Sequence, residues 1–70
     1  MNFKLNDYKP NEAIRIIRDW TELTQIDFGK SINRTDRTIQ AWESGETNYN
    51  VAMLINIANK HGIEITIQKK

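Results

Sequence analysis

Apolar residues in the segment 11–20 recur three and four positions apart. The set comprises Ala13, Ile14, Ile16, Ile17 and Trp20. This spacing puts them on one broad face of a helix, which predicts an amphipathic helix packed against a core. Pro10 can open that helix, because the N–H that proline lacks would have no partner in the first helical turn.

A second helix is predicted over residues 25–32. Thr24, with Asp27 three positions later, resembles a capping box, in which the threonine hydroxyl accepts a backbone N–H. Asn33 follows, and asparagine tolerates the left-handed backbone that a tight turn between helices requires. The segment therefore predicts a short helix that ends in a sharp turn.

A third helix is predicted over residues 36–44, with Thr35 as its cap and Gly45 as its left-handed terminator. Two short helices joined by such a turn form a helix-turn-helix unit, here residues 24–44. The unit needs a small residue where its helices cross, and Gly29 occupies that position. Ordinary packing of two helices would give the same pattern, so periodicity alone does not establish a function.

A fourth helix is predicted between Asn50, a favourable capping residue, and Gly62. The stripe expected to face the core comprises Val51, Leu54, Ile55 and Ala58. Met53 and Ile57 widen the apolar surface beyond what a single core needs, which makes them candidates for an interface.

Residues 63–68 alternate between apolar and polar side chains, a pattern typical of a strand with one apolar face. Its apolar members are Ile63, Ile65 and Ile67. A lone strand needs a partner. The candidates are residues 2–6, which show a weaker alternation, the same strand of a second subunit, or both.

The whole chain, residues 1–70, is predicted to be a single, mainly α domain of four helices with a short C-terminal strand and a second strand near the N-terminus. A chain this short buries only about 60% of its unfolded surface, so small domains usually need further stabilisation by a disulfide, a metal ion or a partner subunit. With no cysteine and a single histidine, His61, neither a disulfide nor a cysteine or histidine metal site is expected. Association with a second subunit is therefore the remaining way to stabilise the domain.

The net charge and the absence of several motifs argue against some classes of function. The formal net charge is only +1, so any affinity for nucleic acid must come from local placement of charge. No nucleophile elbow, phosphate-binding glycine loop or zinc ligand set is present, so we expect neither an enzyme nor a cofactor. No apolar run suits a membrane span or a signal peptide, which predicts a soluble, cytoplasmic protein without membrane contact.

Two blocks of sequence resemble the Cro/C1-type (XRE-like) repressor domain, whose fold is lambda-repressor-like. The first, Leu23-Thr24-Gln25-x-x-Phe28-Gly29-x-x-Ile32, is similar to the family's LTQxxLAxxL segment. The second, Thr38-Ile39-x-x-Trp42-Glu43-x-Gly45, is similar to its TIxxWExG continuation, at the same spacing. Residues 12–63 carry the resemblance. Glycine at 29 and asparagine at 33 depart from the family's usual alanine and glycine.

The resemblance implies a regulator that binds double-stranded DNA, with roles for individual residues. Arg37 would read a guanine edge, and Gln25 would hold a phosphate. Asp36 would either contact a cytosine or only stabilise the helix start. The full set of expected DNA-binding residues is Gln25, Thr35, Asp36, Arg37, Thr38, Gln40, Ala41 and Ser44.

The resemblance also implies an ion pair between Arg18 and Glu43, two charges that could otherwise be separately solvated. In small members of the family, terminal strands build a dimer, so Ile63, Ile65 and Ile67 are expected to mediate dimerisation. A homodimer would bind a near-palindromic operator and act as a repressor. The alternative is a protein-interaction module, or an antitoxin that binds a toxin, using the terminal strand to extend a partner's sheet.

Overall fold

Four helices and two short strands make up the computed structural model, which describes residues 2–69. The helices are α1 (Pro10–Thr21), α2 (Gln25–Ser31), α3 (Asp36–Ser44) and α4 (Val51–Lys60). The strands are β1 (Asn2–Lys4) and β2 (Glu64–Thr66), and a 3-10 turn, η1 (Leu5–Asp7), links β1 to α1. The predicted mainly α fold of four helices with terminal strands is confirmed.

The helix boundaries follow the predicted local signals. The hydroxyl of Thr24 accepts the N–H of Asp27 at 3.1 Å, and that of Thr35 accepts the N–H of Thr38 at 3.3 Å. The side chain of Asn50 accepts the N–H of Met53 at 2.7 Å. Each bond satisfies a backbone donor that the first helical turn leaves free. Gly45 ends α3 in the left-handed conformation, with φ at 85°.

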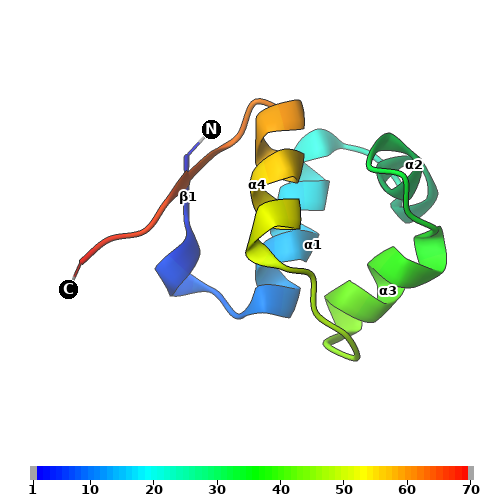
Figure 1. Cartoon of the computed structure of the whole chain (residues 1–70), viewed down its shortest axis with the longest axis horizontal. Helices are drawn as coiled ribbons and strands as arrows, with labels where there is room; N and C mark the ends of the chain where they lie inside the picture. The colour runs from blue at the N-terminus through cyan, green and yellow to red at the C-terminus, as the bar shows by residue number, and fades with distance from the viewer. Residues whose placement is uncertain (1, 70) are drawn as a thin grey trace.

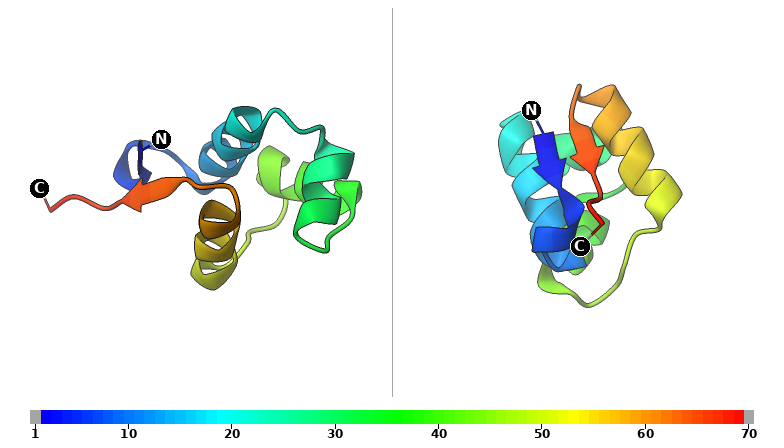
Figure 2. Two further views of the ribbon diagram at one scale, coloured as in Figure 1. Left: turned by 90° about the horizontal axis from the view of Figure 1, so that it is seen from above. Right: turned by 90° about the vertical axis from the view of Figure 1, so that its left-hand side faces the viewer.

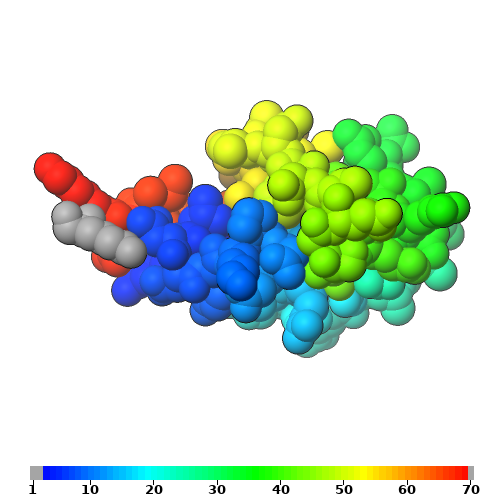
Figure 3. Space-filling model, turned by 90° about the horizontal axis from the view of Figure 1, so that it is seen from below, coloured from blue at the N-terminus to red at the C-terminus, as the bar shows by residue number. Residues whose placement is uncertain are grey.

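The elements form an elongated body measuring 35 × 25 × 19 Å. Figure 1 shows α2 and α3 at one end of the long axis, the strands at the other, and α1 and α4 between them. The views in Figure 2 show the same order, with the two strands side by side at the end of the molecule. The space-filling view in Figure 3 likewise separates the terminal segments from residues 30–45. The helix-turn-helix unit and the sheet therefore lie far apart.

A single apolar core joins α1 to every other element. Its buried members are Phe3, Ala13, Ile14, Ile17, Phe28, Ile39, Trp42, Leu54, Ile57, Ala58 and Ile63. Tyr49 closes the α3–α4 loop over this core: its ring meets that of Trp42 edge to face, and its hydroxyl donates to the carbonyl of Pro10 at 2.7 Å. Burial raises the pKa of Tyr49 above its ordinary value of 10.0. No helix within residues 2–69 is long and apolar enough to cross a bilayer.

The strands pair within the chain and run parallel, with Phe3 opposite Ile65. The observed strand is shorter than the predicted 63–68, because Ile63 precedes it in the core and Ile67 follows it with 71% of its surface exposed. Phe3 also stacks on Tyr8 and contacts Trp20, with ring centroids 4.8 Å and 5.5 Å away. These contacts attach the N-terminal segment to the end of α1.

The predicted orientation of α4 is partly wrong. Leu54 and Ala58 face the core as expected, but Val51 and Ile55 are 66% and 49% exposed. Ile57, an interface candidate from the sequence, is fully buried instead. The helix is rotated so that Ile57 rather than Ile55 enters the core that it shares with residues of α1, α2 and α3.

Candidate nucleic-acid interface

The α2–α3 pair is held at its crossing by close backbone contact at Gly29. The N–H of Arg34 donates to the Gly29 carbonyl at 2.7 Å. A Cβ atom on Gly29 would lie 2.6 Å from the Arg34 carbonyl oxygen, nearer than a real Cβ approaches backbone. Asn33 supplies the turn with its left-handed backbone, at φ 60°. The predicted roles of Gly29 and Asn33 thus have a direct geometric basis.

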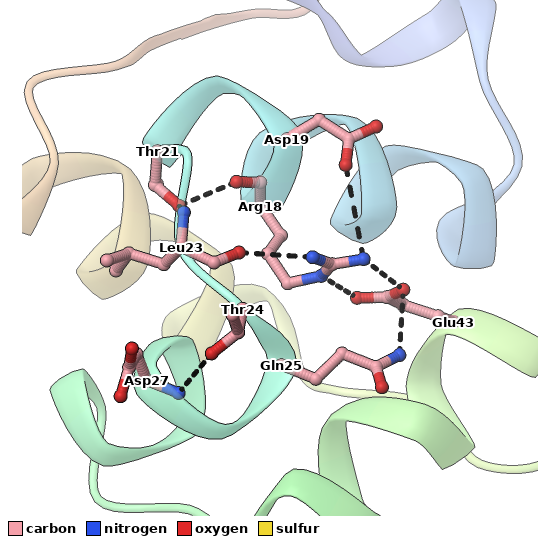
Figure 4. A network of polar contacts seen from close by, with 8 residues as sticks. All are labelled: Arg18, Asp19, Thr21, Leu23, Thr24, Gln25, Asp27 and Glu43. Atoms are coloured by element: carbon pink, nitrogen blue, oxygen red, sulfur yellow. Dashed lines mark hydrogen bonds and ion pairs between the residues drawn. The ribbon is translucent and has the colours of Figure 1, made fainter.

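A polar network locks α3 against α1, as Figure 4 shows. Arg18 Nε donates to Glu43 Oε2 at 2.6 Å, and Nη2 donates to Oε1 at 3.1 Å. Arg18 Nη1 also donates to the Leu23 carbonyl at 3.1 Å. The two side chains are only 18% and 8% exposed. The hydrogen bond to Glu43 raises the pKa of Arg18, so the guanidinium stays charged.

Gln25, expected to hold a phosphate, belongs to the same network. Its amide Nε2 donates to Glu43 Oε1 at 3.2 Å, across from the Arg18 contacts (Figure 4). One of its two amide protons is therefore engaged inside the protein, and the other remains for an external acceptor. This bond was not predicted, since Gln25 and Glu43 lie 18 residues apart in the sequence.

Arg37 differs from Arg18 in its exposure and in its lack of bonding partners among residues 2–69. It lies in the first turn of α3, its side chain is exposed, and it forms no hydrogen bond or ion pair with any other residue in 2–69. Its neighbour Asp36 is half-buried, also in that first turn. An unpaired guanidinium on an exposed helix presents five donors to whatever approaches that surface.

The remaining candidate residues line the same helix. Gln40 and Ser44 are exposed, whereas Thr38 and Ala41 are half-buried. The hydroxyl of Ser44 donates to the Ala41 carbonyl at 3.2 Å, and those of Thr35 and Thr38 lie 3.1 Å apart. Among residues 2–69, the long side chains of Arg37 and Gln40 thus have no hydrogen-bond partner, while Ser44 and the two threonines already have partners in α3 or its cap.

A shallow hollow at the start of α3 adds two basic residues absent from the predicted set. It has a volume of about 400 Å³ and is lined by Lys30, Asn33, Arg34, Thr35 and Thr38. Lys30 and Arg34 bring two positive charges and no acid to this hollow. Their sequence signal was the pair of cations flanking the turn, which the near-neutral overall charge concealed.

Among residues 2–69, no group of three or more histidine, aspartate or glutamate side chains could hold a metal ion.

The sequence was compared with models of known protein families, with curated proteins and with solved structures. A family model described as Helix-turn-helix matches residues 14–68, which include all four helices except the first turn of α1. Searches of curated proteins and of solved structures found no match.

Proposed function

Because this chain belongs to the Cro/C1-type helix-turn-helix family of DNA-binding regulators, we propose that it is a sequence-specific transcriptional repressor. In this proposal α3 enters the major groove of double-stranded DNA, and a homodimer binds a near-palindromic operator, where it blocks polymerase. Family membership supports DNA binding in general. The residue roles, the repression and the dimer are the proposed part.

The observation that carries the proposal is the contrast between Arg18 and Arg37. Arg18 forms an ion pair with Glu43, whereas Arg37 is exposed and has no partner among the described residues. A guanidinium can donate two parallel hydrogen bonds to O6 and N7 of guanine in the major groove. Arg37 is therefore the proposed base-reading residue.

Other residues of α3 have supporting roles in the proposal. Gln40, three positions after Arg37, would read adenine or brace the arginine, and Ala41 would contact a thymine methyl group. Asp36 would chiefly stabilise the helix start, where a negative charge is favourable. Thr35, Thr38 and Ser44 would contact phosphate or sugar through their hydroxyls.

Phosphate contacts are proposed on both sides of α3. Gln25 would use its free amide proton and its place in the first turn of α2. Lys30 and Arg34 would neutralise phosphates along the hollow at the start of α3. Such contacts set the register on the duplex without reading sequence.

The rival proposal is a protein-interaction module, such as an antitoxin that extends a partner's sheet. It has less support, because β2 has only three residues and already pairs with β1. The two proposals differ in salt dependence: DNA affinity falls steeply as salt rises, whereas an adaptor shows no salt-dependent binding to DNA.

Selection from a random pool of duplex fragments by the purified chain tests the function. The expected result is one enriched sequence with two-fold symmetry, bound more weakly at higher salt. Equal recovery of all sequences, or recovery independent of salt, would contradict the proposal. Binding to an asymmetric single site would contradict the dimer and leave DNA recognition intact.

A further inference from the structure

We propose that the outward face of α4 is the dimer interface and packs against the same face of a second copy of this chain. The inference rests on the proposed function, because it explains how two copies of α3 reach one operator. It replaces the terminal isoleucines as the main contact: Ile63 is 6% exposed and buried in its own core, and Ile65 is half-buried.

The face carries two exposed aliphatic side chains with a hollow beside each. Val51 and Ile55, one helical turn apart, are 66% and 49% exposed. Beside the start of α4 lies a mostly apolar hollow of about 270 Å³, lined by Leu5, Tyr8, Pro10, Asn48, Tyr49, Val51 and Leu54. Farther along the helix lies a hollow of about 370 Å³, lined by Ile55, Ala58, Asn59, Ile63, Glu64, Ile65 and Thr66.

A face with both protruding side chains and hollows suits contact with a second copy of itself. When two copies meet about a two-fold axis, the same patch of each is used, so a residue of one copy contacts a different residue of the other and the reverse contact is also made. Val51 or Ile55 of one copy can then enter a hollow of the other, in the way that helix ridges fill grooves between packed helices. Val51 and the mostly apolar hollow beside it form a contiguous apolar patch, the kind of surface that marks an interaction site.

The absence of charge favours a second copy as the occupant. Helix α4 has no acidic or basic residue from Val51 to Asn59, and its first cation is Lys60 at the C-terminal end. Around a two-fold axis identical residues approach one another, so charges near the axis would repel. The centres of protein interfaces are also depleted of charge, with polar groups at the rim. Glu64 is exposed and lines the second hollow, so in the proposed dimer its carboxylate would face solvent at the edge of the contact.

The spacing of the major grooves points the same way. Two recognition helices must lie about 34–36 Å apart to enter successive major grooves. The molecule is 35 Å long, with the sheet and α3 at opposite ends (Figure 1). A dimer joined end to end through the sheet would separate the two α3 helices by nearly two molecular lengths. Contact through α4 allows the copies to lie side by side, and a two-fold axis along the length of the molecule then keeps both α3 helices at the same end.

Sedimentation velocity over a concentration series tests the interface on the whole chain. We expect the natural protein to be a dimer and Ile55→Lys to weaken self-association at least about 10-fold. Ile26→Lys is the matched control, since Ile26 lies on α2 and is 53% exposed, close to the 49% of Ile55. Both substitutions replace exposed side chains, and circular dichroism verifies that each variant folds.

Ile67→Lys completes the design, because Ile67 follows β2 and is 71% exposed. Dimers that survive Ile67→Lys and Ile26→Lys but dissociate with Ile55→Lys support the α4 interface. A monomeric natural protein, or dissociation by Ile67→Lys alone, would overturn it. Titration with a half-operator, which a monomer can bind, separates the two proposals. The Ile55→Lys variant should still bind it, and binding should weaken when Arg37 is also replaced by alanine. If replacing Arg37 had no effect, only the proposal that Arg37 reads DNA would be contradicted.

Discussion

The guanidinium of Arg18 and the carboxylate of Glu43 face each other with Nε and Oε2 2.6 Å apart, and the pair joins α1 to α3 across 25 residues of sequence. It also recruits Gln25 from α2. Three helices thus share one carboxylate. The orientation of α3, and with it the direction of Arg37, depends on this contact.

Arg18→Ala should destabilise the fold by about 3 kcal/mol, because a carboxylate that is 8% exposed loses its counter-charge. Denaturation by urea measures the loss. The control is Arg15→Ala on the same helix, at an exposed position, where a change within about 0.5 kcal/mol is expected. Equal effects of the two variants would mean that the pair contributes nothing.

Arg37→Ala should leave stability unchanged and cost about 1–3 kcal/mol of binding, confined to one base position of each half-site. Fluorescence anisotropy with the selected operator and its single-base variants measures this loss. Arg34→Ala is the comparison: it should weaken binding to all sequences alike and reduce the slope of affinity against salt. A uniform loss in Arg37→Ala would reassign Arg37 to phosphate contact.

Gly29→Ala should destabilise the α2–α3 crossing by about 1–3 kcal/mol, because the added Cβ meets the Arg34 carbonyl oxygen at 2.6 Å. Thermal unfolding gives the change. Asn33→Gly is the counterpart in the same turn, and it should be neutral or slightly stabilising, because glycine adopts a φ of 60° without strain. A stable Gly29→Ala protein would show that the turn can move away from the helix.

Acid should destabilise the protein in part through His61, at the end of α4. Burial, and secondarily Lys60, lowers the pKa of His61 below its ordinary 6.5; its ring lies against Phe28 and its Nε2 is 3.4 Å from the Ser31 hydroxyl. The unfolded chain therefore takes up the proton first. This part of the stability is complete above pH 6.5 and declines as pH falls through the lowered pKa.

Urea denaturation at a series of pH values, compared between the natural protein and His61→Gln, isolates this effect. The variant should lose less stability between neutral and mildly acidic pH, since the carboxylates are common to both proteins. Parallel curves for the two proteins would assign the acid sensitivity to other groups.

Local features of this fold could be predicted because each depends on a side chain and the backbone within four residues of it. Thr24, Thr35 and Asn50 cap helices at the expected positions, and Asn33 and Gly45 adopt the expected left-handed conformation. A cap or a turn satisfies its own hydrogen bonds, so the rest of the molecule has little influence on it.

The long-range ion pair came from resemblance rather than from local chemistry. Positions matching the family's arginine and glutamate predicted the Arg18–Glu43 contact, which the structure contains. The engagement of Gln25 by the same carboxylate was not predicted, because it depends on how closely α2 approaches α3.

Sequence by itself therefore determined where the helices begin and end, the αL turn between α2 and α3, and the family. Tertiary structure alone decided that Ile57 is buried while Ile55 is exposed and that β2 pairs in parallel with β1. It also decided that Arg37 has no partner among residues 2–69. The physical reason is that apolar residues cover a broad face of α4, so several rotations of the helix about its axis are equally consistent with the sequence pattern. Only the neighbouring elements select which of those residues lose contact with water.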